Sequence, residues 1–396
     1  MGSGLLDLET AQNGLLHLLP AMPVETVSVD DALGRYCAEP VMAQRTQPPA
    51  DLSAMDGFAV AGDGPWTIIG ESRCGAPFAG ELAPNEATFV STGAVMPCGA
   101  DAVLIKENAE VEGRNLSATT PPASGRHIRR EGFDFRSGDE ILPAGARIGA
   151  AQLALLLGGG CRTIVTARKP QLAIFETGDE LLIDPKGDAP SAIPASNGAM
   201  LAAMCAAEPC VARRHAPLPD RLDDIARALQ TADEADLVVI SGGASVGDHD
   251  LVRPALERIG AEIAFWKVAM KPGKPLMVAT RGSQVILGLP GNPVSSFVTG
   301  MLFMLPAVRR LCGSANPMPV KLPVFAAEDL PPVGTRMEFL RGTIDADGGR
   351  PLLQQDSSGL GALAQANCLI ERPAGCAGVK AGTVVPVYPL GNGRTA

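Results

Sequence analysis

The sequence predicts a multidomain chain in which a central, largely parallel α/β sandwich is flanked by small all-β domains. The chain has 396 residues, 46% of them apolar, which is enough for about two to four domains of ~100–200 residues. Residues 170–312 alternate apolar strands with helical segments, the pattern of a sheet covered on both faces. Residues 51–136 and 317–396 instead carry short apolar runs punctuated by Gly and Pro, which is typical of small β domains.

The N-terminal part is predicted to begin with a helix, because apolar residues recur at helical spacing over residues 5–19. Residues 24–38 indicate a short strand and a turn, and residues 41–50 are extended and contain Pro. An apolar helix is expected at Ala150–Leu157, ended by the glycines at 158–160. Between these parts, four strands are expected in the first β domain: Gly57–Val60, Trp66–Ile69, Ala87–Val90 and Ala102–Ile105.

The central region is predicted to contain six strands and four helices. In open sheets of this kind, ligands bind beyond the carboxyl ends of the strands, so the loops that follow the strands are the candidate sites. The last β domain is represented best by the apolar run Val384–Tyr388. The central strands are Leu172–Phe175, Val211–His215, Leu237–Ile240, Ile263–Phe265, Leu276–Thr280 and Val285–Leu289, and the helices lie near Gly198–Ala207, Arg221–Ala232, Leu251–Ile259 and Ser295–Leu311.

Composition argues against several classes of function. The net charge of −10 disfavours general nucleic-acid binding, which needs a basic face, and the 4% of aromatic residues leaves few stacking platforms. The nine Cys show no C-x-x-C or zinc-like spacing, so we expect reduced thiols in a reducing compartment. The first residues lack a signal-peptide pattern, and no apolar run approaches the ~18 residues that span a bilayer. We therefore expect a cytoplasmic protein that binds neither nucleic acid nor membrane.

The most informative stretch is a lysine-bearing turn followed by two strands and a Gly/Pro loop. Lys271-Pro-Gly-Lys274-Pro leads into the first strand, and the second breaks into Pro290-Gly-Asn-Pro-Val-Ser-Ser296 before a long apolar segment. A helix start with free N–H groups near ammonium groups is an anion site. The Pro/Gly turn also leaves its lysines little freedom to lose on binding. With Lys267 nearby, this stretch predicts a bound anion such as a phosphorylated ligand.

A second loop that is predicted to bind an anion follows the strand that ends at Ile240. Its glycines permit close approach of the backbone to a ligand, and its serines offer hydroxyl donors. Asp248 and Asp250 come next, and Asp250 is either a helix N-cap or a ligand of a hard cation such as Mg²⁺. An ordinary strand-to-helix turn has the same composition, so this loop alone leaves its role open. The residues concerned are Ser241, Gly242, Gly243, Ser245 and Gly247.

Three carboxyls, Glu176, Asp179 and Glu180, follow the first strand of the same domain. Such a run of carboxyls most often forms a solvated turn. This run, however, lies at the carboxyl end of a strand, which favours a functional role. From chemistry alone, residues 53–60, 91–101 and 128–134 are turns or charged edges. The four His show no metal or triad spacing, so a Ser/His/Asp hydrolase is unsupported.

Seven motifs together resemble the MoeA family of molybdopterin molybdotransferases, the bacterial relatives of the gephyrin E domain. Ser53-Ala-Met-Asp-Gly-Phe-Ala59 is similar to the family's S-x-M-D-G-[YF]-A. The stretch from Ser91-Thr-Gly-Ala to Gly99-Ala-Asp-Ala-Val103 is similar to T-G-A-x-x-P-x-G-A-D-A-V. Ile128-Arg-Arg-Glu-Gly-Phe-Asp134 resembles I-R-x-x-G-x-D, with Phe133 where an acidic residue is common. The others follow in the family's order: Thr177–Leu181, Ser241–Gly247 with Asp250, Lys271–Pro275 and Leu289–Ser295.

The resemblance implies the last step of molybdenum cofactor synthesis. Molybdate is inserted into the dithiolene of adenylylated molybdopterin and AMP is released, with a divalent cation such as Mg²⁺. The family also implies an elongated homodimer of L-shaped, four-domain subunits, in which each active cleft takes residues from both subunits. Asp56 and Thr92 are therefore expected to serve the partner's α/β domain. A molybdopterin adenylyltransferase and proteins that deliver the cofactor to molybdoenzymes are further candidate partners, and whether the adenylyltransferase docks directly stays open.

The implied domains are a discontinuous first domain, 1–45 plus 137–167, then a small β domain, 46–136, the molybdopterin-binding α/β domain, 168–316, and a C-terminal β-barrel-like domain, 317–396. The residues carried over as catalytic are Asp56, Thr92, Arg129, Asp134, Glu180, Asp220, Asp250, Lys267, Lys271 and Lys274. The lysines and Arg129 would neutralise molybdate or the pterin phosphate. In-line displacement at phosphorus needs charge neutralisation and positioning more than a nucleophilic side chain, which suits a site without a catalytic His or Cys.

Two further groups of residues complete the implied site. Glu180, Asp220 and Asp250 would place Mg²⁺ or orient an attacking oxygen at the AMP phosphate. Backbone N–H groups of residues 242–247 and 291–295 would cradle the phosphates. The cofactor-binding residues are Ser241, Gly242, Gly243, Ser245, Gly247, Pro290, Gly291, Asn292 and Ser295.

Three other functions share parts of this pattern. The related adenylyltransferase shares the α/β domain but is a single compact domain, so the flanking regions 1–136 and 317–396 argue against it. A scaffold of the gephyrin type would have a second fused α/β domain and a long linker, and neither is present. A nucleotide pyrophosphatase of the competence-protein type carries a related α/β domain, but the Ser53–Ala59 segment favours the transferase.

Overall fold

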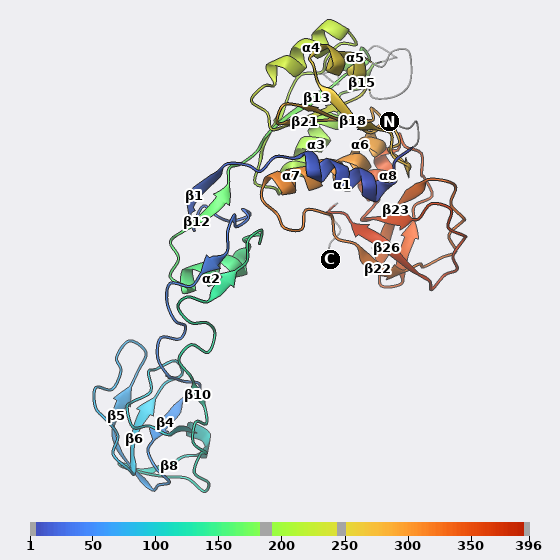
Figure 1. The fold of residues 1–396 in the computed structure, drawn as a ribbon. Coiled ribbons are helices and arrows are strands. Elements are labelled where there is room, and N and C mark those ends of the chain that lie inside the picture. Colours follow the sequence, from blue (N-terminus) through green and yellow to red (C-terminus); the bar gives the residue numbers. More distant parts are fainter. Residues whose placement is uncertain (1–4, 183–191, 244–250, 392–396) are drawn as a thin grey trace.

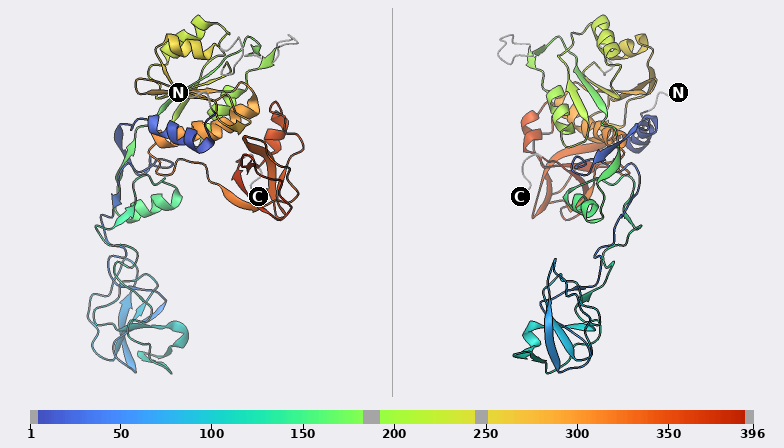
Figure 2. Two further views of the ribbon diagram at one scale, coloured as in Figure 1. Left: turned by 45° about the vertical axis from the view of Figure 1, so that its right-hand side comes forward. Right: turned by 90° about the vertical axis from the view of Figure 1, so that its left-hand side faces the viewer.

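The computed structural model describes residues 5–182, 192–243 and 251–391 and confirms the predicted fold class. A broad body formed by the α/β domain and the C-terminal β domain carries a narrow arm that ends in the small β domain (Figure 1). Two further views show the same separation of the arm from the body (Figure 2). The subunit is therefore elongated, and the two regions that carry most of the predicted site residues lie at opposite ends of it.

A mixed six-stranded sheet forms the centre of the α/β domain, in the order β16-β13-β17-β21-β20-β18. The first three neighbouring pairs are parallel, whereas β20 and β18 run antiparallel to their neighbours. β17 is apolar from Leu237 to Ile240 and fully buried, as expected for a central strand covered on both faces. The strands are β13 (Gln171–Glu176), β16 (Val211–Arg214), β17 (Leu237–Ser241), β18 (Glu262–Trp266), β20 (Met277–Arg281) and β21 (Gln284–Leu289).

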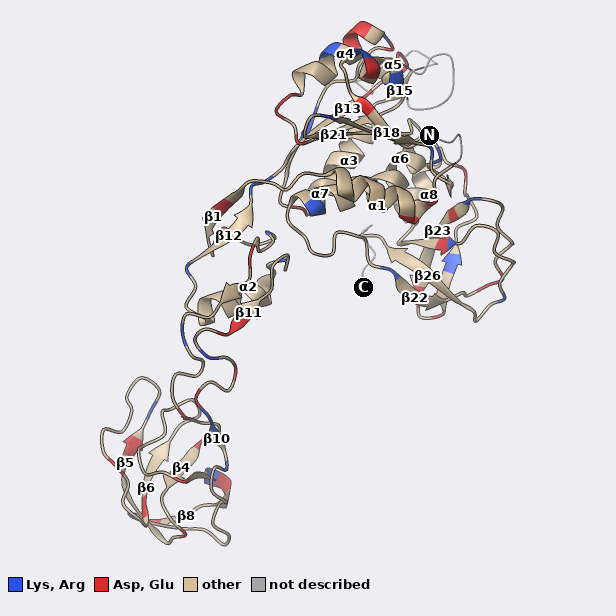
Figure 3. Ribbon diagram, in the orientation of Figure 1, with Lys and Arg blue, Asp and Glu red and all other residues tan. Residues whose placement is uncertain are grey.

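Helices cover both faces because side chains alternate along each strand. Leu172 and Ile174 of β13 join the core beneath α1, α3, α6 and α7, whereas Ala173 and Phe175 join the core beneath α4 and α5. Charged side chains are concentrated on α4 and α5, and the helix layer on the other face is mostly uncharged (Figure 3). The helices are α1 (Leu8–Leu18), α3 (Asn197–Cys205), α4 (Leu222–Thr231), α5 (Val252–Arg258), α6 (Pro293–Thr299) and α7 (Leu305–Leu311).

The longest helix is continuous from 293 to 311, because the π-helical segment η2 (Gly300–Met304) joins α6 to α7. The side chain of Gln12 donates a hydrogen bond of 2.8 Å to the carbonyl of Leu302 in η2, which ties α1 to the α/β domain. This helix is long and apolar enough to cross a membrane by length and composition, which corrects the expectation that no apolar run approaches that length. Because 78% of the window is buried inside the protein, it is a core helix.

The arm begins with segments from both sides of the small β domain. β1 (Val24–Ser28) pairs antiparallel with β12 (Thr163–Ala167), and β2 (Val41–Met42) pairs with β11 (Glu140–Leu142). They enclose a small core with α2 (Ala150–Gly158). This pairing agrees with a discontinuous first domain, although the predicted domain boundaries stay predictions.

Each β domain is built on its own six-stranded sheet. In the small domain the order is β7-β4-β6-β5-β9-β8, around Phe58, Trp66 and Leu116. Its strands are β4 (Gly57–Val60), β5 (Trp66–Ser72), β6 (Glu86–Val90), β7 (Ala102–Ile105), β8 (Glu110–Glu112) and β9 (Asn115–Ser117), and the short pair β3 (Leu52–Ser53) and β10 (Ile128–Arg129) lies beside it.

The C-terminal sheet has the order β19-β23-β25-β26-β22, with β24 on β23. A bridge between Ala326 and Gly349 links its two sides, which curls the sheet. β19 comes from the lysine turn, so this pairing docks the C-terminal domain onto the α/β domain. The elements are β19 (Met270–Lys271), β22 (Leu322–Phe325), β23 (Met337–Asp345), β24 (Gly348–Pro351), α8 (Leu360–Gln365), β25 (Cys368–Arg372) and β26 (Val384–Pro389).

Candidate functional site

Three loops meet at the carboxyl ends of β13, β17 and β21 and enclose a cavity of about 300 Å³. The strands are neighbours and parallel, so their carboxyl ends lie at one edge of the sheet, where an open α/β sheet binds ligands. The short strands β14 (Leu181–Leu182) and β15 (Ile193–Pro194) and the start of α3 complete the wall. Of the residues predicted to bind or catalyse, Glu180, Asp220, Ser241, Gly242, Gly243 and Gly291 line this cavity.

The loop after β13 is held from both sides by backbone hydrogen bonds. Thr177 donates its N–H to the carbonyl of Ser241, and Gly178 donates to the carbonyl of Leu218. A Cβ on Gly242 would lie 2.5 Å from the carbonyl oxygen of Thr177, and the φ of Gly242 is +102°, so only glycine fits there. The glycine at 242 therefore brings two strand ends together.

A buried carboxylate lies at the base of the cavity. The side chain of Glu176 is only 2% exposed and pairs with Arg214 at 3.3 Å. Arg214 also donates to the carbonyl of Ala195 at 2.7 Å, which connects β16 to the segment before α3. A Cβ on Gly198 would lie 2.5 Å from the Glu176 carboxylate, so α3 approaches this ion pair closely.

Asn197, the first residue of α3, links two of the loops. Its Nδ2 donates to Ser241 Oγ at 3.0 Å and to the Gly291 carbonyl at 2.8 Å. Ser241 Oγ in turn lies 3.1 Å from the Pro290 carbonyl and 3.2 Å from Ser296 Oγ. Sequence reasoning missed Asn197, because an Asn at a helix start is ordinarily explained as a cap.

The carboxylates predicted to hold a cation are only partly described. Glu180 and Asp220 both line the cavity, and the N–H of Asp220 bonds Asp179 Oδ1 at 3.0 Å, which joins their two loops. Asp250 lies outside the described residues, as do Ser245 and Gly247. Over residues 5–182, 192–243 and 251–391, no group of three or more His, Cys, Asp and Glu side chains could hold a metal ion. Glu180 and Asp220 still offer the carboxylate oxygens that Mg²⁺ prefers.

Two of the backbone N–H groups predicted to cradle the phosphates are already hydrogen-bonded within the fold. The N–H of Gly242 bonds the Leu289 carbonyl at 3.1 Å, and the N–H of Val294 bonds the Ser357 carbonyl at 3.2 Å. Backbone amides committed inside the fold are not available to a phosphate, which is the physical reason for this correction. For Gly243, Gly291 and Ser295 the cradle stays a prediction. Asn292 caps α6 without a side-chain cap bond, and its Oδ1 has no partner among the described residues.

The three lysines do not line this cavity, and their predicted place near the helix start at residues 290–296 stays a prediction. Lys271 belongs to β19, and pairing with β23 turns it toward the C-terminal domain, where its Nζ is 2.9 Å from Glu338 Oε1. Lys267 Nζ lies 4.0 Å from the centre of the Trp266 ring. Lys274 is exposed. Proximity in sequence to β20 did not place these side chains at the carboxyl ends of the parallel strands.

The C-terminal domain also supplies a loop that sequence reasoning missed. Arg341, buried on β23, donates to the carbonyls of Gln354 and Asp356 at 2.8 and 2.9 Å. The loop so held presents Ser357 to the start of α6. Because Pro293 of α6 lines the cavity, this loop borders the candidate site.

The remaining predicted residues lie in the small β domain, far from the cavity (Figure 1). Asp56 Oδ1 accepts hydrogen bonds from the Thr92 N–H at 2.6 Å and the Thr92 hydroxyl at 2.9 Å. These bonds, the backbone bond first, lower the pKa of Asp56 below its ordinary value. Arg129 and Asp134 are exposed on the same domain. One subunit therefore keeps its predicted site residues in two separate places.

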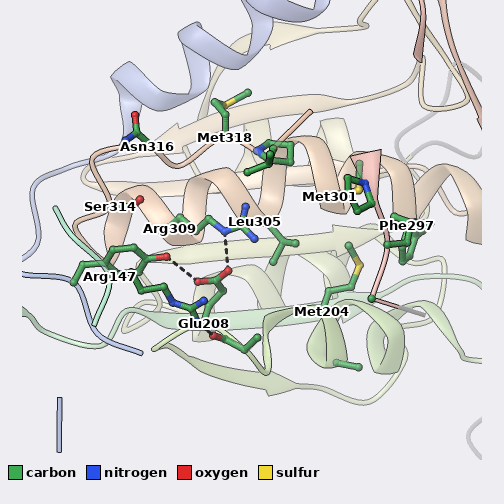
Figure 4. Close-up of a pocket in the computed structure, with 18 of the residues that line it drawn as sticks. Arg147, Met204, Glu208, Phe297, Met301, Leu305, Arg309, Ser314, Asn316 and Met318 are labelled. Carbon is green, nitrogen blue, oxygen red and sulfur yellow. Dashed lines mark hydrogen bonds and ion pairs between the residues drawn. The ribbon is translucent and has the colours of Figure 1, made fainter. Parts of the chain in front are cut away.

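A larger cavity of about 990 Å³ lies between the first domain, the α/β domain and the C-terminal domain. Met204, Met301 and Phe297 line one end of it, and Arg147, Glu208 and Arg309 line the other (Figure 4). Arg309 pairs with Glu208 at 2.7 Å. None of the predicted site residues lines it, so this cavity is separate from the candidate site.

Comparison with known proteins covers almost the whole chain. Residues 6–160 match the MoeA N-terminal region (domain I and II), residues 173–310 a probable molybdopterin binding domain, and residues 323–390 the MoeA C-terminal region (domain IV).

Curated relatives and a solved structure match over the same length. A molybdopterin molybdenumtransferase from Nostoc sp. is 34% identical over 96% of this chain and 92% of its own. One from Haemophilus influenzae is 31% identical over 98% and 99%. The crystal structure of a molybdopterin biosynthesis moeA protein from Pyrococcus horikoshii superposes with a TM-score of 0.85, at 26% identity, over 98% of this chain and 100% of that chain.

Proposed function

The chain belongs to the MoeA family of molybdopterin molybdenumtransferases, and from this premise we propose that it inserts molybdate into adenylylated molybdopterin and releases AMP. The observation that carries the proposal is the full-length match to curated transferases, in a chain whose α/β domain has its cavity where such a sheet binds ligands. The protein is thus a transferase that acts in molybdenum cofactor synthesis.

AMP release is a displacement at a phosphorus atom. It requires the protein to position the reacting groups and to neutralise charge on the phosphate. Glu180 and Asp220 line the cavity and would hold a divalent cation such as Mg²⁺, which when bound neutralises charge on the AMP phosphate. The hydrogen bond from Asp220 N–H to Asp179 holds these two carboxylates on connected loops. Glu176, paired with Arg214, keeps the base of the cavity rigid.

The full site is proposed to form in a homodimer in the cytoplasm. The small β domain projects from the body at the end of the arm, so Asp56, Thr92, Arg129 and Asp134 have nothing of their own α/β domain beside them (Figure 1). Placing them against the partner's cavity would unite the two halves of the predicted site. Lys267, Lys271 and Lys274 would then meet the oxyanion from the side of the C-terminal domain.

The test is AMP release by purified protein given adenylylated molybdopterin and Mg²⁺, with and without molybdate, together with an assay of molybdenum insertion. We expect release that depends on molybdate and yields active cofactor. Release without molybdate and without insertion would indicate a pyrophosphatase instead. Binding of the substrate with no release would indicate a scaffold.

A further inference from the structure

Three thiols gather around the turn that joins α3 to β16. Cys205 ends α3, Cys210 precedes β16, and Cys312 follows α7 from a distant part of the chain. Cys205 and Cys312 are 1% and 3% exposed and belong to one hydrophobic core, against which the partly buried Cys210 packs. Within the described ranges these thiols join no group of side chains that could hold a metal ion, which leaves the chemistry of the thiols themselves.

The backbone of this turn brings Cys210 back beside Cys205. The N–H of Glu208 donates to the Cys205 carbonyl at 2.9 Å, and the N–H of Cys210 donates to the Glu208 carbonyl at 2.8 Å. Cys210 Sγ lies 3.8 Å from the Cys205 carbonyl oxygen, so the sulfur of one cysteine lies against the backbone of the other. A disulfide can form without backbone movement only between cysteines that are close neighbours in space, and this turn makes them so.

The two thiols of the turn also contact each other. Cys205 donates its S–H to the Cys210 sulfur, and this bond is the main reason that the pKa of Cys210 lies below its ordinary value. The same bond, followed by burial, raises the pKa of Cys205. Burial and the Glu208 carboxylate oppose ionisation of Cys210, but the charge of Glu208 is paired with Arg309 at 2.7 Å. Cys210 is therefore the thiol that ionises, and Cys205 keeps its proton.

Cys312 is placed differently, although it belongs to the same cluster. Its Sγ lies 3.6 Å from the Pro209 carbonyl oxygen, to which the thiol donates. Burial raises the pKa of this thiol. Cys312 is therefore a buried neighbour of the turn rather than a partner of Cys210, and it provides an internal control.

We infer that Cys205 and Cys210 form a reversible disulfide when the protein meets a hydroperoxide, with Cys210 as the thiol that attacks first. The Cys210 thiolate attacks one peroxide oxygen, an S–O bond forms, the O–O bond breaks, and the leaving oxygen takes a proton from solvent. The Cys205 sulfur then attacks the Cys210 sulfur. The S–S bond forms, the S–O bond breaks, and hydroxide leaves with the Cys205 proton as water. The two cysteines together lose two electrons, which the peroxide gains.

The disulfide closes the turn at which the first domain meets the α/β domain (Figure 4). Arg147 donates to the carbonyl of Ala207, and the Tyr36 hydroxyl donates to Glu208 at 3.3 Å. Both donors come from the first domain, whereas Arg309 reaches the same Glu208 from α7. The modification thus acts where the arm joins the body. It goes beyond the proposed transferase activity and does not depend on it.

The test maps the disulfide in the full-length, pre-reduced protein after treatment with hydrogen peroxide. Free thiols are alkylated, and trypsin leaves Cys205 and Cys210 on one peptide, residues 187–213, and Cys312 on another, residues 311–321. The first peptide should lose both alkylation sites and two hydrogen atoms, and dithiothreitol should restore them. The disulfide should form at least about tenfold faster than the exposed Cys98 is oxidised, because thiolate character as well as exposure sets the rate.

Three variants assign the roles within the cluster. Cys205→Ser should leave a sulfenic acid on Cys210, which dimedone captures, and Cys210→Ser should abolish disulfide formation. Cys312→Ser is the matched control, because it removes a buried thiol of the same cluster, and it should form the disulfide at the wild-type rate. Capture by dimedone at Cys205 in Cys210→Ser, with none at Cys210 in Cys205→Ser, would overturn the assignment of the attacking thiol.

Other products from wild type overturn the inference without any variant having to fold. Residues 187–213 joined to residues 311–321 would make Cys312 the partner. Two copies of the 187–213 peptide joined together would mean that the bond forms between molecules. Oxidation of Cys98 with no change at Cys205 and Cys210 would show that the turn does not favour the reaction.

Discussion

The cavity of the α/β domain and the Asp56–Thr92 turn of the small β domain carry equally dense polar motifs, yet they are built in opposite ways. In the α/β domain, three parallel strands end at one edge, and glycines let their loops close on one another around a defined volume. In the small β domain, Asp56 is exposed, and its carboxylate accepts hydrogen bonds from Thr92.

The difference shows what each region still lacks. The cavity has carboxylates but no lining cation among the described residues. The small β domain has a preorganised carboxylate, with Arg129 exposed on the same domain, but its residues line neither of the two cavities described above. We therefore propose that each region is half of a site, which two copies of the chain would complete together.

The largest expected effect comes from residues of the α/β domain that are predicted to be catalytic. Glu180→Ala, and equally Lys271→Ala, should lower molybdate-dependent AMP release by a factor on the order of 10² or more, because charge control dominates this chemistry. Both side chains are exposed, so thermal unfolding should stay close to wild type. A variant that loses activity by unfolding would instead show that its residue has a structural role.

The second prediction tests whether the two halves meet across a dimer. Asp56→Ala and Glu180→Ala should each be inactive alone, and co-expression in equal amounts should restore about a quarter of wild-type activity. Half of the dimers are then mixed, and in each mixed dimer one of two symmetric sites keeps both residues. No recovery in verified mixed dimers would mean that the two residues do not act at a site shared between subunits.

A smaller effect is expected from the pH dependence of the small β domain. Hydrogen bonds from Thr92 lower the pKa of Asp56, so the carboxylate stays charged to lower pH and its contribution is lost only as pH falls through that lowered pKa. Thr92→Val removes the hydroxyl bond but keeps the backbone bond. The acidic limb of the AMP-release profile should therefore shift part of the way to higher pH. An unchanged limb would show that Asp56 does not set it.

The smallest effect should be seen at the lysine turn, where the C-terminal domain docks onto the α/β domain. Glu338→Gln removes the partner of Lys271, but the two side chains are 21% and 58% exposed, so the pair should contribute less than about 1 kcal/mol to stability. Chemical denaturation of the variant and of wild type measures this difference in the free energy of unfolding. A loss well above that value would mean that the ion pair, rather than the β19–β23 pairing, holds the C-terminal domain in place.

Sequence patterns predicted most of the fold because each pattern reports a local requirement. The apolar runs of β17 and β21, the alternation along β13 and the helix that ends at Gly158 are set by burial and by backbone conformation within a few residues. The glycine at 242 was found for the same reason, since close approach of backbones excludes a side chain there. The motifs also determined the family.

What only the tertiary structure decided is which of these residues meet. Lys271 and the Gly242 loop both follow strands of the sheet region, but pairing of β19 with β23 draws the lysine toward the C-terminal domain. Asn197, which carried no clear signal, became the link between two loops because α3 begins where β17 and β21 end. The sequence by itself determined the elements, the loop chemistry and the reaction class, because these depend on neighbours along the chain. The composition of the cavity depends on contacts between distant segments, and only the folded chain sets those.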